Sequence, residues 1–338
     1  MIATATGTTN RRNGLRVSVV ALLLILTAGC AREPVSHESP DATRNSSGPT
    51  TGATIQQPRT EAPPVFDIEA VLTSTPEDTA TLRQRLREEL DVNFTWYERD
   101  DGKVLIAPLG FNKSLQDKDL IALAGLEGPL EVSLTSTAIT DAGLALLARM
   151  RATERQGRPL LAEIHHLYLN ATRISDRGLP HLAAFGTLRT LDLSDTQVTD
   201  AGLSHLARLS QLQRLFLSRT RMTGSGLVHL QSLSALRELD LTGTALDDAC
   251  LQQLPSLPNL RKLVLRNTRI TDAGLDRLKA LPALEELDLT GTGITDGCVA
   301  SIKELKRLRR LRIVDKTKLT ERGAIQLRLA LPDYVYID

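Results

Sequence analysis

The sequence predicts an α/β solenoid in which a parallel sheet lines the concave face and short helices lie outside. The first observation is periodicity: the tripeptides LYL, LDL, LFL, LDL, LVL, LDL and LRI begin at residues 167, 191, 215, 239, 263, 287 and 311, so every gap is 24 residues. The second is composition, because aromatic residues make up only 3% of the chain and the core must be aliphatic. Since one such unit cannot bury its apolar face alone, stacked units have to form the core.

Each unit is predicted to contain one short strand, one turn and one short helix. Leu212, Leu215 and Leu217 alternate, which is typical of a strand with one buried side. The stretch LDLSDTQVTDAGL ends at Leu203, and further leucines follow it every three residues, at Leu206 and Leu209. This spacing is that of the buried side of a helix. A column of residues with a side-chain oxygen precedes each helix and is expected to cap it: Thr140, Ser175, Thr199, Thr223, Asp247, Thr271 and Thr295. The residue after this column is mostly Asp, which suits the positive end of a helix.

The pattern LxxLxxLxLxxTxITDAGLxxL resembles leucine-rich repeats, most closely the subtype whose turn reads ITDxGL, over roughly residues 115–330. With the copy EVSLTSTAITDAGL and a weaker copy that begins at Leu115, there are about eight units. The family often places Asn or Cys where this chain has Thr137, Thr172, Thr196, Thr220, Thr244, Thr268 and Thr292. In the family this side chain bonds the backbone of the neighbouring repeat. A hydroxyl offers fewer hydrogen-bonding groups than an amide, so we expect Thr196 and its equivalents to form a thinner ladder and a softer solenoid.

Both ends of the solenoid are expected to carry caps, the N-terminal one over residues 66–114 and the C-terminal one within residues 115–338. TSTPEDTATLRQRLREEL predicts a helix, and NFTWYERDDGKVLIAPLGF predicts a hairpin that turns at Asp101 and Gly102. Trp96, the only tryptophan, is expected to cover the first repeat. Near the C-terminus, a helix over residues 323–331 is followed by DYVYID, which is expected to close the sheet.

Residues 1–29 resemble the signal peptide of a bacterial lipoprotein. RRNGLR is a cationic segment, and VSVVALLLIL is an apolar segment that is too short to span a bilayer comfortably. LTAGC is similar to a lipobox, in which the cysteine, here Cys30, becomes the lipidated N-terminus, although Thr27 stands where Leu is commonest. The resemblance implies a stable membrane anchor, because several acyl chains hold more firmly than one. An ordinary signal peptide with a chance cysteine is the alternative.

Residues 30–65 are predicted to be a flexible tether, because they are rich in Ser, Thr, Pro and Gly and poor in large apolar residues. Arg11 and Arg12 faintly resemble a twin-arginine export signal, but Gly14 replaces its bulky apolar residue, which favours the Sec route. Ala31 follows Cys30 in place of the Asp that retains many Gram-negative lipoproteins in the inner membrane. The outer membrane or cell surface is therefore the favoured location.

The charge balance and the motif search argue against two classes of function. With 41 basic and 40 acidic residues, the chain lacks the basic excess of a general nucleic-acid binder. None of the patterns G-x-S-x-G, H-E-x-x-H, G-x-G-x-x-G or the P-loop occurs. The sequence therefore predicts a protein that is not an enzyme and has no cofactor.

The spacing of about 4.8 Å between neighbouring strands separates residues that look paired in the sequence. Cys250 and Cys298 lie two repeats apart, about 10 Å, whereas a disulfide needs Cα atoms about 4.4–6.8 Å apart. We expect both to be small buried residues. The same separation applies to Asp192, Asp240 and Asp288, and calcium needs ligands within about 2.6 Å, so these acids are expected to be solvated or paired across strands.

Two further features of the strands bear on binding. His165 and His166 are expected to point to opposite sides of their strand, which argues against a shared metal ion. The column before the acids reads His166, Thr190, Arg214, Glu238, Lys262, Glu286 and Arg310. Its last five residues alternate in sign, which favours ion pairs between neighbouring strands.

The concave face is the first candidate interaction surface. Phe216 on a charged sheet could anchor a partner, because aromatic residues and Arg are enriched at interface hot spots. Isolated surface hydrophobes are also normal, so an ordinary surface residue is the equal alternative. The candidate partner-binding residues are Tyr168, Asp192, Arg214, Phe216, Asp240, Lys262, Val264, Arg266, Asp288 and Arg312.

An Arg-rich insert over residues 149–163 is the second candidate, because insertions in solenoids often map to binding faces. It carries Arg149, Arg151, Arg155 and Arg158, and a neutral loop is the favoured alternative.

These features together predict an envelope-anchored lipoprotein that recognises a protein or peptide non-covalently through the concave face. The expected partners are a protein or peptide ligand and the membrane, through the lipid anchor, with no nucleic acid. A structural scaffold or a polysaccharide-binding envelope protein is the alternative, although few aromatic residues are expected on the concave face to stack against sugars.

Overall fold

The computed structural model describes residues 94–98, 104–108, 115–126, 128–155, 157–313, 317–332 and 335–337. All of them lie in the second of the two units into which the chain divides, Pro63–Asp338. The predicted signal peptide, the tether and the helix over residues 73–90 fall outside the described residues, as does the side chain of Trp96. The expectations about them stay predictions.

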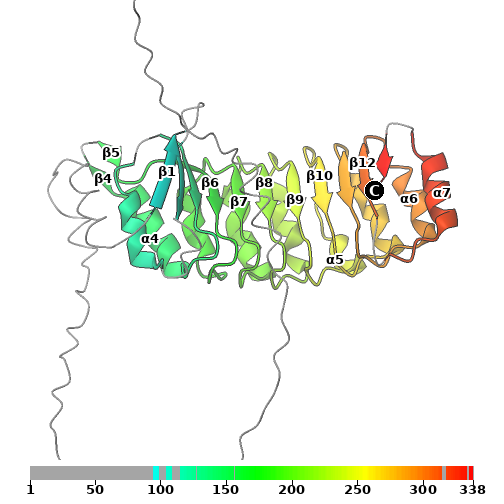
Figure 1. The fold of residues 1–338 in the computed structure, drawn as a ribbon, viewed down its shortest axis with the longest axis horizontal. Coiled ribbons are helices and arrows are strands. Elements are labelled where there is room, and N and C mark those ends of the chain that lie inside the picture. Colours follow the sequence, from blue (N-terminus) through cyan, green and yellow to red (C-terminus); the bar gives the residue numbers. More distant parts are fainter. Residues whose placement is uncertain are drawn as a thin grey trace, which may run out of the picture. The chain divides into compact units, whose positions relative to one another are not determined.

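A parallel sheet runs through the repeats, and short helices lie beside it (Figure 1). Each strand pairs with the next in a register of one repeat, so that Leu191 lies opposite Leu215 and Leu215 opposite Leu239. The predicted α/β solenoid is confirmed. Its strands are β3 (Leu130–Ser133), β6 (Ile164–Tyr168), β7 (Thr190–Asp192), β8 (Arg214–Phe216), β9 (Glu238–Asp240), β10 (Lys262–Val264), β11 (Glu286–Asp288) and β12 (Arg310–Arg312).

The predicted hairpin before the repeats and the closing strand after them are both present. β1 (Phe94–Glu98) and β2 (Val104–Pro108) pair antiparallel, and β2 pairs parallel with β3. The turn at Asp101 and Gly102 lies outside the described residues. At the other end, helix α7 (Glu321–Ala330) precedes β13 (Tyr336–Ile337), which pairs parallel with β12.

Most helices between the strands are 3₁₀ helices. This form has three residues per turn and therefore suits leucines that recur every three residues. Leu203, Leu206 and Leu215 are fully buried, and Phe185 is the only aromatic side chain in the core of the described residues. The remaining helices are η1 (Asp117–Leu123), α4 (Asp141–Ala152), η2 (Leu179–Ala184), η3 (Asp200–Arg208), η4 (Ser225–Ser232), α5 (Asp248–Leu251), η5 (Asp272–Ala280), η6 (Asp296–Cys298) and α6 (Val299–Ile302).

The predicted capping column holds at five of its seven positions, and before η2 the cap position is taken by Gly178 in place of Ser175. The side chains of Thr140, Thr199, Asp247, Thr271 and Thr295 each accept a hydrogen bond from a backbone N–H of the following helix. Before η4, Gly224 takes the cap position with a left-handed φ of 110°, and Thr223 instead donates its hydroxyl to Asp200.

The threonine column does not link neighbouring repeats, so that prediction is wrong. Thr196 donates its hydroxyl to the carbonyl of Leu193 in its own repeat, at 2.5 Å, and its equivalents do the same. The reason is the turn after each strand. Asp195 has a φ of 56°, and this left-handed residue folds Thr196 back over the end of its own strand.

The link between repeats is made by the aspartate that follows the capping residue. Asp176 accepts the backbone N–H of Thr199 at 2.8 Å and its hydroxyl at 2.6 Å. We call this series of contacts the aspartate ladder. Its members are Asp117–Thr140, Asp141–Ser175, Asp176–Thr199, Asp200–Thr223, Asp248–Thr271, Asp272–Thr295 and Asp296–Thr320.

The ladder is interrupted at one junction, where Gly224 stands in the aspartate column and Asp247 in the capping column. At a regular junction the ladder carboxylate crowds a glycine, since a Cβ on Gly202 would lie 2.4 Å from an Asp176 oxygen. At the interrupted junction Cys250 occupies that glycine position, and a Cβ on Gly224 would lie 2.7 Å from the Cys250 Cβ. The missing carboxylate therefore leaves the space that the Cys250 side chain fills.

The two cysteines of the repeats are free. Cys298 is buried, as predicted, and this burial raises its pKa to about 12. Cys250 is only half-buried, which differs from the prediction, because it borders the interrupted junction.

Candidate interaction face

The strands expose one side of the sheet and bury the other. In β8, Leu215 is buried, whereas Arg214 is exposed and Phe216 is half-buried. We call the side that carries Arg214 and Phe216 the sheet face; it corresponds to the predicted concave face. Every candidate partner-binding residue on the strands lies in one of its columns.

The charged column of the sheet face pairs across strands as predicted. Arg214 donates through Nε to Glu238 at 2.7 Å, and Lys262 donates through Nζ to the other Glu238 oxygen at 2.6 Å. Further along, Arg310 lies 3.2 Å from Glu286. Burial alone would raise the pKa of Glu238, but the hydrogen bonds from Lys262 and Arg214 outweigh it and hold this pKa below its usual value.

Phe216 joins this group through Arg214. The Arg214 guanidinium carbon lies 5.1 Å from the centre of the Phe216 ring, which is within the range of a cation–π contact. We call Arg214, Phe216, Glu238 and Lys262 the Arg214 cluster. Its members come from three neighbouring strands, so the sheet register alone brings them together.

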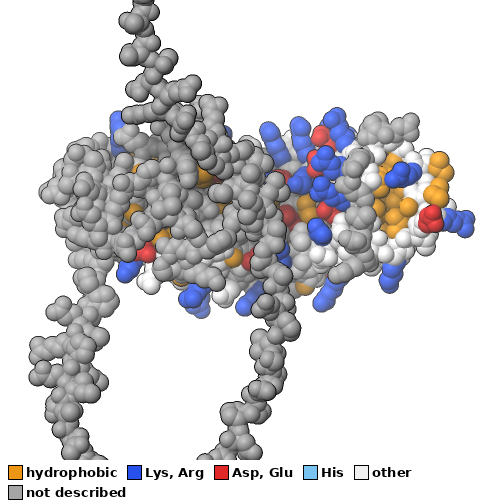
Figure 2. Space-filling model, in the orientation of Figure 1, with side chains coloured by type: hydrophobic (Ala, Val, Ile, Leu, Met, Phe, Trp, Pro, Cys, Tyr) orange, Lys and Arg blue, Asp and Glu red, His pale blue; other side chains and the backbone are white. Residues whose placement is uncertain are grey.

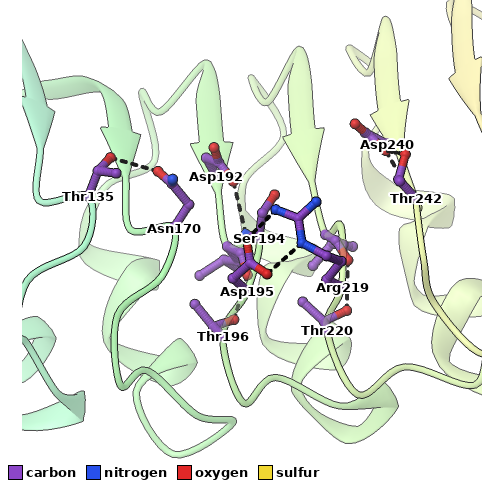
Figure 3. Close-up of polar contacts among 12 residues, drawn as sticks. Thr135, Asn170, Asp192, Ser194, Asp195, Thr196, Arg219, Thr220, Asp240 and Thr242 are labelled. Carbon is purple, nitrogen blue, oxygen red and sulfur yellow. Dashed lines mark hydrogen bonds and ion pairs between the residues drawn. The ribbon is translucent and has the colours of Figure 1, made fainter. Parts of the chain in front are cut away.

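The acids of the middle column are held by their own turns. Asp192 accepts the backbone N–H of Ser194 at 2.9 Å, and Asp240 accepts the N–H and hydroxyl of Thr242 at 2.8 and 2.6 Å (Figure 3). The sequence had suggested that these acids are solvated or paired with a base across the strands. Instead, each carboxylate accepts a hydrogen bond from the backbone N–H two residues further along its own turn. Burial raises the pKa of Asp192, and the negative charges of Asp240 and Asp195 add to this effect.

Asp288 is less accessible than the other acids of this column. It accepts the backbone N–H of Thr290 at 2.9 Å, and only 8% of the residue is exposed. Tyr168, at the other end of the sheet face, is half-buried and donates its hydroxyl to Glu131 at 3.3 Å. Val264 is half-buried on β10, and Arg266 and Arg312 are exposed.

An ion pair that sequence analysis missed lies at the turns beside this face. Arg219 donates through Nε to Asp195 at 2.6 Å, and a second contact joins Arg219 Nη2 to the other carboxylate oxygen (Figure 3). This contact bridges two repeats. Both residues belong to a left-handed column: Ser136, Ala171, Asp195, Arg219, Gly243, Asn267 and Gly291. Its Asp, Asn and Gly residues were the signal in the sequence, because these types tolerate a positive φ.

The Arg-rich insert contains regular structure, and its role in binding stays a prediction. Helix α4 continues through Arg149 and Arg151 to Ala152, and β4 (Glu154–Arg155) and β5 (Arg158–Pro159) then form a short antiparallel pair. Leu160 and Leu161, which follow, are buried and anchor the insert to the core.

The two adjacent histidines of β6 contact different groups. His166 Nδ1 lies 2.9 Å from the Thr190 hydroxyl, and His165 lies 3.6 Å from Glu163, so they have different partners. β6 bulges here, and both histidines are half-buried. Within the described ranges, no group of three or more His, Cys, Asp and Glu side chains could hold a metal. The helices in the same ranges are too short or too polar to cross a bilayer.

Comparisons with known proteins identify the repeats. Residues 186–246 match the model "Leucine rich repeat", and residues 258–296 match "Leucine Rich repeats (2 copies)". The chain therefore contains leucine-rich repeats. No curated protein matches it. Among solved structures, an internalin (inlF) from Listeria monocytogenes is similar, with a TM-score of 0.44 and 20% identity over 62% of this chain and 67% of that chain. Leucine-rich-repeat domains generally serve as scaffolds for protein–protein interaction.

Proposed function

We propose that this protein is an envelope-anchored lipoprotein that binds a protein or peptide non-covalently through the sheet face, and that it is not an enzyme. The lipobox-like LTAGC supports an anchor at Cys30, and residues 30–65 would tether the repeats to the outer membrane or cell surface. The repeats would belong to the subtype whose turn reads ITDxGL. The general role of such repeats in protein binding supports the choice of ligand class.

The Arg214 cluster is the observation that carries the proposed binding mode. Arg and aromatic side chains dominate interface hot spots, and here Arg214 and Phe216 stand together on an open sheet. Arg214 is already held by Glu238 and by the Phe216 ring, so less side-chain freedom would be lost when a ligand binds. Asp192 and Asp240 lie on either side of Phe216, and each accepts a hydrogen bond from its own turn. They would therefore keep their positions when a ligand contacts Phe216.

Cross-linking in cells followed by affinity capture tests this binding mode. The full chain is compared with a Phe216→Glu/Arg214→Glu variant, and the partner is expected to be lost from that variant. The matched control is Val228→Glu/Arg221→Glu, which makes the same changes at an exposed Val on η4 and an exposed Arg. Thermal unfolding shows that each variant is folded. Identical partners from wild type and the Phe216 variant would overturn the binding mode, and glycans captured in place of protein would support the polysaccharide alternative.

The lipid anchor has its own test. Metabolic labelling with an alkyne fatty acid should label the wild type and a Cys250→Ser control but leave a Cys30→Ser variant unlabelled. Label that persists in the Cys30→Ser protein would exclude a lipid anchor at this residue.

A further inference from the structure

The residue directly before each strand forms a stacked column along one edge of the sheet. Arg261 donates its backbone N–H to Arg237 at 2.8 Å, Glu285 donates to Arg261 at 2.8 Å, and Arg309 donates to Glu285 at 2.7 Å. These bonds place Arg237, Arg261, Glu285 and Arg309 side by side in successive repeats. Figure 2 shows Lys and Arg side chains gathered over β9–β12, with a few acidic side chains among them.

This edge column differs in its charges from the paired column one residue further along. In the paired column the signs alternate, and Glu238 binds a base on each side. In the edge column Arg237 is stacked next to Arg261, and like charges in this arrangement destabilise a sheet. Within the described ranges, Arg237 and Arg309 have no ion-pair partner, and Arg261 reaches Glu285 only at 3.8 Å.

A hollow of about 530 Å³ adjoins the edge where the chain enters β11 and β12, and it is lined by Glu285, Lys306, Arg307 and Arg309. Lys306 is the most exposed of the paired bases, with 73% of its side chain open to solvent and Glu304 at 3.6 Å. Arg307, like Arg309, has no ion-pair partner among the residues that the structure describes. The hollow therefore collects three cationic side chains, and only Lys306 has an ion-pair partner among the described residues.

We propose that this basic edge, formed by Arg237, Arg261, Lys306, Arg307 and Arg309, binds an acidic segment of the partner protein. The proposal rests on the proposed function and specifies the chemistry of its ligand. Guanidinium groups bind carboxylates through two parallel hydrogen bonds, and a row of them attracts an acidic segment before contact. The edge lies directly beside the Arg214 cluster, since Glu238 and Lys262 each follow a member of the edge column in the chain.

Glu285 favours a polypeptide over a phosphate polymer as this ligand. It stands between Arg261 and Arg309, in the middle of the basic edge, and it also lines the hollow. A polymer with an anion at every position would place one against the Glu285 carboxylate. A polypeptide can put a neutral or basic residue there.

A peptide titration tests the proposal without a known partner. A fluorescent peptide of alternating glutamate and glycine is titrated into the full chain at low salt, and its anisotropy is measured. An Arg237→Glu/Arg261→Glu/Arg309→Glu variant should bind it about tenfold more weakly or worse, because three exposed charge contacts are reversed. The matched control, Arg177→Glu/Arg208→Glu/Arg221→Glu, changes three exposed arginines elsewhere and should bind with nearly unchanged affinity.

Three results would overturn the proposal: no binding by the wild type, equal weakening in the edge and control variants, or tighter binding of linear polyphosphate than of the peptide. The last would assign the edge to a phosphate polymer. A milder Arg→Gln variant at the same three positions, which should weaken binding by less, covers the case in which the Glu variant fails to fold. The titration uses no cellular partner, so its outcome is independent of the capture experiment. The basic edge can therefore fail while binding through the sheet face holds, and binding through the sheet face can fail while the basic edge holds.

Discussion

Two junctions of the same solenoid are built differently. At the regular junction, Asp176 reaches across to Thr199 and crowds Gly202. At the other, Gly224 offers no carboxylate, Asp247 replaces the threonine, and Cys250 replaces the glycine. The difference teaches that the ladder carboxylate and a side chain in the glycine column compete for one space at these two junctions. At the Asp272–Thr295 junction the contact is intact although Cys298 stands in the glycine column, and there the carboxylate lies against Gly297 instead.

The stability of a solenoid is approximately a sum of repeat and junction contributions. A junction without its ladder contact should therefore be the place where the stack opens first.

The largest effect is expected from Gly202→Ala. The new Cβ would lie 2.4 Å from an Asp176 oxygen and 2.6 Å from Leu179, so the ladder contact must move. We expect the free energy of unfolding to fall by about 3 kcal/mol, from overpacking together with a weakened hydrogen bond. Cys250→Ala, in the same column at the interrupted junction, should cost less than about 1.5 kcal/mol, because a Cβ is already accommodated there. Urea unfolding measures both, and equal losses would contradict the coupling.

The next effect concerns rebuilding the interrupted junction. Gly224→Asp alone should destabilise the protein, since a Cβ there would lie 2.2 Å from Leu246 and 2.7 Å from the Cys250 Cβ. Adding Asp247→Thr and Cys250→Gly restores the regular pattern, and this triple variant should recover about 2 kcal/mol relative to the single one.

Hydrogen exchange gives the second measurement for the rebuilt junction. Amides of α5 should exchange more slowly in the triple variant than in the wild type, because the new ladder contact holds this helix to η4. A triple variant as unstable as Gly224→Asp would show that the three columns act independently.

Removing one ladder carboxylate should have a moderate effect. Asp176→Ala leaves the N–H and hydroxyl of Thr199 without their acceptor, and the free energy of unfolding should fall by about 1–2 kcal/mol. Gln211→Ala, at an exposed position, serves as the control and should change it by less than about 0.5 kcal/mol. If Asp176→Ala lowered the free energy of unfolding by no more than Gln211→Ala does, the ladder contact would not contribute to stability.

The smallest effect is a pH dependence at Asp200, the last ladder residue before the interruption. Burial alone would raise its pKa, but hydrogen bonds from Gly226, Thr223 and Gly224 outweigh this and hold the pKa below its ordinary value of 3.8. A carboxylate with a lowered folded pKa stabilises the protein above the unfolded pKa, and this stabilisation is lost as pH falls through the folded pKa. Asp200→Asn should therefore be less stable than wild type at pH 7, and the gap should close in acid below about pH 3.8. Urea unfolding at a series of pH values measures this difference in the free energy of unfolding. A difference that stays constant from pH 7 to below about pH 3.8 would contradict the role of the Asp200 carboxylate.

Much of the fold followed from local chemistry in the chain. The 24-residue period determined the register of the sheet, the alternation of Leu215 and Leu217 determined which side is buried, and the alternating signs determined the pairs around Glu238. These features depend on spacing along the chain and on the fixed distance between strands, and both can be known from the sequence.

The partner of each polar side chain was decided only by the tertiary structure. Thr196 bonds its own repeat, Asp176 links to the next one, Asp195 pairs with Arg219, and Asp288 is buried. Each outcome depends on the direction in which the chain turns at the left-handed residue after the strand, and on the position of each repeat relative to its neighbour. The sequence by itself determined the repeat and its apolar core, because periodicity and hydrophobicity are properties of single positions. The contacts between repeats belong to pairs of positions in three dimensions, and stacking alone brings those pairs together.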